Sequence, residues 1–217
     1  MKKTVLLIFA LGAYASVSAM EFKAGYAQTD ITPPLGVYMP GYYNARYAKE
    51  VLDPLKVVCI VFSDGKNTAL VMQVDTVLMT DDIGDEMRRA VTKATGVAYG
   101  AIMIHSSHTH DGGHLAMSRK TGTSFSGHDM DEKDELYLKM VKSRVADAAV
   151  NAIRDMKPSR ISYQRTVARR ISFGRRYIMK DGNVRTNPGV NNPDIVKPYG
   201  LPPDEEVQVL RIDREGG

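Results

Sequence analysis

The order of apolar and polar positions divides most of the chain into short strands and two longer helices. Seven stretches carry the apolar runs or the two-residue alternation typical of β-strands: residues 21–30, 55–62, 68–74, 101–104, 160–167, 171–178 and 207–212. Two stretches repeat apolar residues at helical spacing, residues 81–95 and 131–156. Strands that alternate with helices predict an α/β fold, a mixed sheet flanked by helices.

Residues at the ends of the two predicted helices support these assignments. Acidic residues crowd the first turns of 81–95, basic residues follow, and Gly96 can close the helix. Pro158 ends the second helix. The apolar positions that we expect to be buried are Ile83, Met87, Ala90, Val91 and Ala94 in the first helix, and Leu136, Met140, Val145, Ala149, Ala152, Ile153 and Met156 in the second.

The first 19 residues have the organisation of a secretory signal. Lys2 and Lys3 give a positive start, residues 4–13 are apolar, and residues 17–19 (VSA) supply small side chains before a cleavage point. The apolar stretch is too short to span a bilayer. We expect residues 1–19 to be removed and residues 20–217 to be secreted or periplasmic in a bacterium, with an uncleaved anchor as the alternative.

Composition and charge exclude several classes of protein. The 217 residues are 43% hydrophobic and 25% charged, which excludes a disordered or collagen-like chain. The formal charge of +4 falls to +2 without residues 1–19, which hold two lysines and no acidic residue, so the charge indicates no nucleic-acid partner. Cys59 is the only cysteine, which excludes an intramolecular disulfide, and its apolar surroundings predict core packing.

The last residues indicate that the predicted sheet is incomplete. The strand at 207–212 is followed by residues of turn type, 213–217, with no strand after them. A hairpin turn without its second strand predicts that the chain is the N-terminal fragment of a longer protein.

Four of the five histidines lie within ten residues, at His105, His108, His110 and His114. His108 and His110 are two apart, so on an extended segment their imidazoles would point the same way and could approach one zinc ion. The cluster follows a buried strand, where α/β sheets place ligands, and Gly112-Gly113 would leave room for a substrate.

Hydrogen-bonded histidines in a polar loop are the alternative to a metal site, and we expect a structural role for His105, His114 and the isolated His128. A catalytic zinc ion needs three protein ligands and an open position, and the sequence offers two good candidates. The sequence therefore predicts that the other ligands lie beyond residue 217.

Two pairs of arginines follow in the last third of the chain, at Arg169-Arg170 and Arg175-Arg176. They are either solvated charges on an exposed strand or, for one of them, a guanidinium that holds a substrate oxygen or a developing oxyanion. Because a strand alternates its faces, Arg175 and Arg176 cannot both point into one site.

Seven short blocks of the sequence stand out together. They read AGYA at 24–27, DITPPLG at 30–36, MPGY at 39–42, SHTHDG at 107–112, GRRY at 174–177, NPG at 187–189 and DEEVQVL at 204–210. In these residues and in their order, the chain resembles the N-terminal domain of the neutral/alkaline (non-lysosomal) ceramidase family. The resemblance covers residues 20–217, and it implies the N-terminal part of a ceramidase-like metallohydrolase domain.

This resemblance implies an exported, zinc-dependent amidohydrolase that splits N-acylsphingosine, a ceramide, into sphingosine and fatty acid. By resemblance, His108 is a Zn²⁺ ligand, His110 contacts the substrate near the metal, and Arg175 contacts the substrate or the transition state. The family's usual Ser-Gly-Pro is Asp111-Gly112-Gly113 here, which changes the shape of the pocket. The family's remaining ligands come after residue 217, so the fragment alone is expected to be inactive.

Two other interpretations stay open. An exported lipid- or glycan-binding protein could retain the fold without catalysis, and a metal-storage module is a weaker alternative because the histidines are few. Tyr38, Met39, Tyr42 and Tyr43 would allow a transient contact with a membrane surface, although a packed Tyr/Pro loop also explains them.

Overall fold

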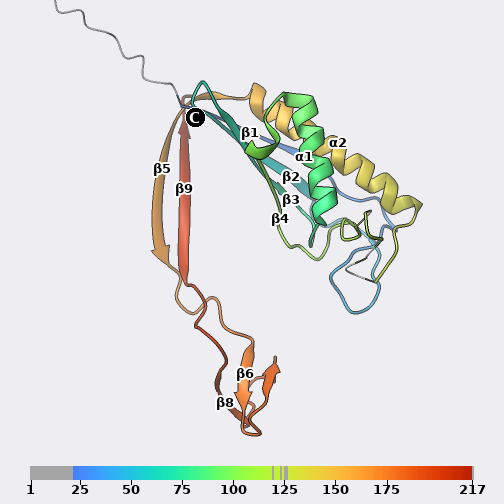
Figure 1. Cartoon of the computed structure of the whole chain (residues 1–217), viewed down its shortest axis with the longest axis vertical. Helices are drawn as coiled ribbons and strands as arrows, with labels where there is room; N and C mark the ends of the chain where they lie inside the picture. The colour runs from blue at the N-terminus through green and yellow to red at the C-terminus, as the bar shows by residue number, and fades with distance from the viewer. Residues whose placement is uncertain (1–21, 119, 123, 125–126, 217) are drawn as a thin grey trace, which may run out of the picture. The chain divides into compact units, whose positions relative to one another are not determined.

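The computed structural model describes residues 22–118, 120–122, 124 and 127–216, so the predicted signal sequence lies outside the described residues (Figure 1). The chain forms two compact units, one ending at Ser159 and one beginning at Arg160. The assignment of residues 20–217 to one metallohydrolase domain stays a prediction.

The first unit is built on four neighbouring strands with two helices. Strands β1 (Lys23–Asp30), β2 (Lys56–Ser63), β3 (Thr68–Val74) and β4 (Ile102–Ser106) lie in the order β4-β3-β2-β1. The pairs β1–β2 and β2–β3 are antiparallel, whereas β3 and β4 are parallel. A parallel pair needs a crossover, which helix α1 (Asp81–Thr95) and the short 3-10 helix η1 (Tyr99–Ala101) supply. The expected mixed α/β sheet is therefore confirmed.

Helix α2 (Glu132–Arg154) packs beside α1, and both helices cover the same face of the sheet (Figure 1). Asp131 begins α2 with a capping box, in which its side chain accepts a hydrogen bond from the backbone N–H of Asp134. Neither helix in the described part of the chain combines the length and the apolar content needed to cross a bilayer.

The core lies between this sheet face and the two helices. Its fully buried side chains include Val57, Val61, Leu70, Met72, Met87, Val141 and Val145. Cys59 belongs to the same core, as expected, and burial raises the pKa of its thiol to about 12.

The predicted buried faces of the helices need two corrections. In α1, Ile83, Met87 and Val91 are buried, but Ala94 is exposed. In α2, Val145, Ala149 and Ala152 are buried as expected, but Leu136 is 61% exposed. The buried residues of the helix are Asp134, Tyr137, Leu138, Val141, Val145, Ala148, Ala149 and Ala152. The buried face begins with the polar Asp134 and the partly polar Tyr137. A prediction from apolar residues alone passed over both and placed the start of the face at Leu136, next to Tyr137.

The second unit consists of strands. Strand β5 (Lys157–Val167) starts beside β1, where Lys157 and Pro158 pair with Ala24 and Lys23, and continues into the second unit, where β9 (Glu206–Arg214) lies next to it. A separate antiparallel sheet has the order β7-β6-β8, formed by β6 (Arg176–Met179), β7 (Val184–Thr186) and β8 (Ile195–Pro198).

The sequence-based strand at 171–178 is wrong in its first part. Regular pairing begins only at Arg176, and residues 172–175 have no strand structure. The two short strands β7 and β8 were also missed, because three or four residues give too little alternation to recognise.

Candidate functional site

The histidine segment leaves the sheet at the carboxyl ends of the parallel strands β3 and β4. Strand β4 ends at Ser106, and the next two residues are tied to the chain that follows β3. The backbone N–H of Ser107 donates to Val74 O at 3.0 Å, and that of His108 donates to Thr76 O at 3.0 Å. These bonds fix the backbone at His108, which places the segment where α/β sheets present ligand-binding residues.

The imidazole of His108 is oriented by the backbone of Val77. Its Nδ1 lies 2.7 Å from the carbonyl oxygen of Val77. A carbonyl only accepts hydrogen bonds, so Nδ1 is the donor, and in the neutral imidazole the lone pair then lies on Nε2. This is the arrangement by which proteins prepare a histidine as a metal ligand through Nε2.

The segment is not extended, contrary to the expectation from the two-residue spacing. His108 has φ of +66°, in the left-handed region that non-glycine residues seldom adopt. The rings of His108 and His110 nevertheless lie close, with centroids 5.1 Å apart and planes at 86°. The two imidazoles are therefore close together, but a turn of the backbone at His108, and not an extended segment, brings them together.

The two glycines after Asp111 face protein atoms. A Cβ on Gly112 would lie 2.8 Å from Asp75 O, and one on Gly113 would lie 2.7 Å from Cδ1 of Tyr137. Both glycines are buried, so the expectation that they leave room for a substrate is wrong. They allow the histidine segment to pack directly on the chain after β3 and on α2.

The other histidines have structural surroundings, as expected. His105 Nδ1 lies 3.4 Å from the carbonyl of its neighbour Ser106. His114 is fully buried, and its Nε2 lies 3.1 Å from His128 O. His128 is isolated in the sequence, yet its ring stacks on Tyr38 with centroids 4.0 Å apart, and its Nε2 lies 3.6 Å from Asp134 Oδ2.

No group of three or more His, Cys, Asp or Glu side chains within the described ranges is arranged to hold a metal ion. The assignments of His108 as a metal ligand and of His110 as a substrate contact stay predictions.

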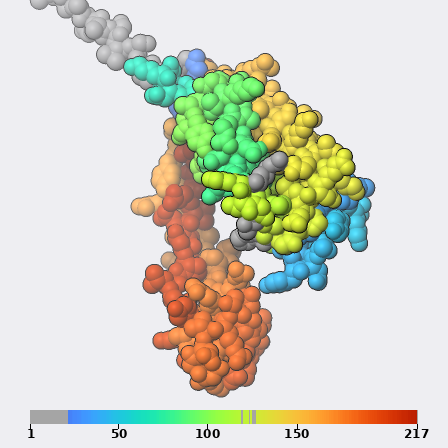
Figure 2. Space-filling model, turned by 45° about the vertical axis from the view of Figure 1, so that its right-hand side comes forward, coloured from blue at the N-terminus to red at the C-terminus, as the bar shows by residue number. Residues whose placement is uncertain are grey.

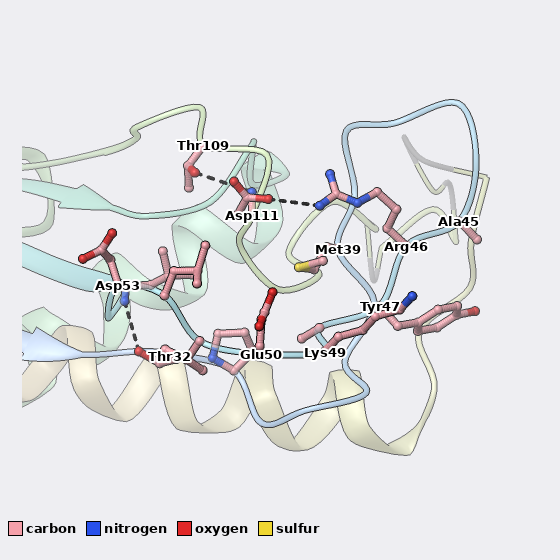
Figure 3. A pocket seen from close by; sticks show the side chains of 15 residues that line it. Thr32, Met39, Ala45, Arg46, Tyr47, Lys49, Glu50, Asp53, Thr109 and Asp111 are labelled. Atoms are coloured by element: carbon pink, nitrogen blue, oxygen red, sulfur yellow. Dashed lines mark hydrogen bonds and ion pairs between the residues drawn. The ribbon is translucent and has the colours of Figure 1, made fainter.

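A pocket of about 730 Å³ lies beside the histidine segment (Figure 3). Thr109 and Asp111 contribute to its wall, and the remaining lining comes from the region before β2: Thr32, Pro33, Met39, Leu55 and residues 45–53. Arg46 crosses from this region to Asp111, with Nη2 3.3 Å from Asp111 Oδ1. The volume is within the range of small-molecule sites, and the wall combines apolar and charged side chains.

Within the Tyr/Pro loop, the tyrosines divide between core and surface. Tyr38 is buried against His114 and His128, whereas Tyr42 and Tyr43 are exposed. The loop forms a protruding part of the surface, coloured light blue in Figure 2. Packing thus explains Tyr38, and a membrane contact through the exposed tyrosines stays a prediction.

The predicted arginine pair lies in the second unit. Arg176 stacks on Tyr199, with Cζ 5.1 Å from the ring centroid, and the exposed Arg175 accepts a backbone hydrogen bond from Asn187 at 2.8 Å. Arg175 lies outside the regular strand, so the alternation argument does not apply to this pair. Its role as a substrate contact stays a prediction.

Two buried groups beside the site have shifted pKa values. Burial lowers the pKa of His114 below its ordinary value of 6.5, because the charged imidazolium loses water. Burial raises the pKa of the Asp134 carboxyl for the same reason, since there the charged form is the deprotonated one.

His114 is expected to make the protein less stable as the pH falls below about 6.5. As the pH falls, the unfolded chain binds a proton at His114 at a higher pH than the folded chain does. The contribution of His114 to the free energy of unfolding is therefore fully present above pH 6.5 and is lost as the pH falls toward the lower pKa of the folded state. The slope contributed by one proton reaches about 1.4 kcal/mol per pH unit. Urea unfolding of the wild type and of His114→Gln between pH 5 and pH 7.5, ~0.5 unit apart, measures it.

Asp134 gives a slope of the opposite sign, because its raised pKa makes stability fall as the pH rises. The charges of His114 and Asp134 act on each other, so the difference between the two curves reports the loss of His114 together with its effect on the Asp134 carboxyl. Parallel curves for wild type and variant would contradict the assignment.

Comparison with known proteins identifies the fold. No protein-family model and no curated protein matches the chain. Two solved structures match 91% of it at 16% identity: neutral ceramidase from Pseudomonas aeruginosa, with a TM-score of 0.63, and a ceramidase complexed with C2, with a TM-score of 0.64. The chain spans 30% of the length of each of these chains. Over nearly all of its length, the chain therefore has a fold similar to part of these ceramidase structures.

Proposed function

We propose that this chain is the N-terminal part of an exported, zinc-dependent hydrolase of lipid amides, with a ceramide-like substrate. The reaction would add water across the amide, breaking the C–N bond to release a fatty acid and an amine. The ceramidase-like fold supports the class of reaction, and the length of the structural neighbours supports a longer protein. Export rests on the sequence of residues 1–19.

The observation that carries the proposal is the orientation of His108. Its Nδ1 donates to Val77 O at 2.7 Å, and this leaves Nε2 as a lone-pair donor at the end of a parallel strand pair. Neutral imidazole held in this way fits Zn²⁺, which binds His nitrogen at about 2.0–2.1 Å. His108 would therefore supply one ligand, and residues outside the described chain would supply the others.

When bound, zinc supplies Lewis-acid chemistry, which makes an amide carbonyl easier to attack and water easier to deprotonate. The residues of this chain prepare the site for that chemistry. Val77 holds His108 in one tautomer, and His110, whose ring centroid lies 5.1 Å from that of His108, would contact the substrate. Arg175 is the proposed second substrate contact, where a guanidinium would steady a developing oxyanion.

Removal of zinc tests this function directly. The complete protein, incubated with ceramide in detergent micelles, is expected to release fatty acid, to lose this activity on dialysis against 1,10-phenanthroline, and to recover it when zinc is added back. Turnover that survives the chelator would overturn the zinc mechanism. Binding of ceramide without release of fatty acid would favour the alternative, an exported lipid-binding protein that retains the fold.

A further inference from the structure

The imidazole of His110 is held by packing. Among the described residues, none forms a hydrogen bond with its ring nitrogens, whereas His108 and His114 each have such a bond. Its neighbours are the ring of His108, the backbone at Gly41 and the ring of Tyr42, whose centroid lies 5.5 Å away at 85°. No hydrogen bond among the described residues therefore fixes the ring, and its orientation depends on the loop that holds Gly41 and Tyr42.

That loop is closed on itself like a hairpin. Met39 N–H donates to Arg46 O at 2.9 Å, Ala48 N–H donates to Val37 O at 2.9 Å, and Tyr38 pairs with Tyr47. Its tip brings Gly41 against His110, where a Cβ would lie 2.6 Å from Nδ1. Gly41 also has φ of +112°, so glycine is required here both by the backbone and by the close approach.

Arg46 connects the tip of the loop to the histidine segment through two contacts. Its Cζ lies over the ring of Tyr42, 4.0 Å from the centroid. Its Nη2 lies 3.3 Å from Oδ1 of Asp111, the residue after His110. One guanidinium thus binds the ring that packs against His110 and also the backbone segment that carries His110.

We propose that Arg46 is a positioning residue that holds His110 in place by clasping Tyr42 to Asp111. Without Arg46, Tyr42 is free to swing away, and the imidazole of His110 gains rotameric freedom beside His108. The proposal rests on the proposed function only for its effect on catalysis. The positioning of the His110 ring by Arg46 does not depend on that function.

Removal of Arg46 is expected to leave the fold intact. The side chains of Arg46 and Asp111 are 39% and 65% exposed, and ion pairs at such exposure contribute little to folding stability. Because loss of a residue that orients a metal-site group typically costs 10- to 100-fold in activity, kcat of Arg46→Ala is expected to fall about tenfold while KM changes less than about twofold.

The experiment compares four forms of the complete protein, with ¹³C-labelled histidine: wild type, Arg46→Ala, Arg46→Lys and Arg88→Ala. Arg88 is a matched control in α1, because it too pairs with an aspartate, Asp85 at 3.2 Å, and lies over a tyrosine, Tyr99 at 5.6 Å. Arg46→Ala is expected to shift and broaden the His110 ring signals in the NMR spectrum. Arg46→Lys should restore them in part, since it keeps a cation between Tyr42 and Asp111.

Unchanged His110 signals in Arg46→Ala, or an equal change in Arg88→Ala, would overturn the positioning role. If the wild-type protein is active and the kcat of Arg46→Ala is unaffected, the expected effect of Arg46 on catalysis is refuted. If the wild-type protein does not release fatty acid from ceramide, the proposed function fails. The NMR comparison then decides the role of Arg46 alone: altered His110 signals support the clasp, and unaltered signals refute it.

Discussion

Gly25→Ala is expected to destabilise the first unit by about 3 kcal/mol or more, a large part of the stability of a typical domain. Gly25 lies in β1, where its pairing partner is Val61 and the end of α2 packs on it. An added Cβ would overlap the carbonyl oxygen of Ala152 and would lie 2.9 Å from the backbone nitrogen of Met156. These are backbone atoms, so no change of rotamer can relieve the clash, and α2 would have to move off the sheet.

Gly100→Ala is the matched control for this substitution. A Cβ on Gly100 meets nothing within 4 Å, and its backbone is not in the left-handed region. Urea unfolding followed by circular dichroism is expected to show a large loss of stability for Gly25→Ala and a change within about 0.5 kcal/mol for Gly100→Ala. Equal stability of the two variants would mean that the end of α2 does not pack closely against Gly25 of β1.

The main elements of the first unit follow from local sequence. The helix α1 begins and ends at the residues expected from its periodicity, and Gly96 ends it with φ of +76°, donating to Thr92 O. The antiparallel pair β2–β3 also follows from two apolar runs around a turn at residues 64–67. In these elements local propensity and tertiary packing favour the same structure, which is why pattern alone suffices.

The contacts that shape the candidate site do not follow from local sequence. Arg46 and Asp111 are 65 positions apart, and no local pattern connects them. The atoms that approach Gly41 and Gly112, His110 Nδ1 and Asp75 O, come from distant parts of the chain and meet these glycines only when the loops fold. The nearness of His108 and His110 was predicted correctly from their spacing, whereas the turn at His108 depends on bonds to Thr76 and Val77 that only the folded chain forms.

His108→Asn is expected to remove zinc from the complete protein and to lower fatty-acid release about a thousandfold. That loss corresponds to about 4 kcal/mol of transition-state stabilisation, the several kcal/mol that a Lewis-acid metal supplies. Asparagine suits the test better than alanine, because it tolerates the left-handed φ of +66° and its amide can still donate to Val77 O. The substitution therefore preserves the backbone and removes the nitrogen that would bind the metal.

His105→Ala is the control, because it removes an imidazole from the same segment. Among the described residues, the hydrogen-bond partner of this imidazole is the neighbouring Ser106 O, 3.4 Å from Nδ1. Zinc per chain, measured by inductively coupled plasma mass spectrometry, should stay within about twofold of wild type in this variant. If His108→Asn retained the wild-type zinc content, the ligand assignment would be wrong even where activity was lost. Zinc lost from both variants would indicate that the segment as a whole had been disturbed, and the specific role of His108 would then be rejected. Only loss confined to His108→Asn fits a histidine that the Val77 carbonyl holds ready as a metal ligand.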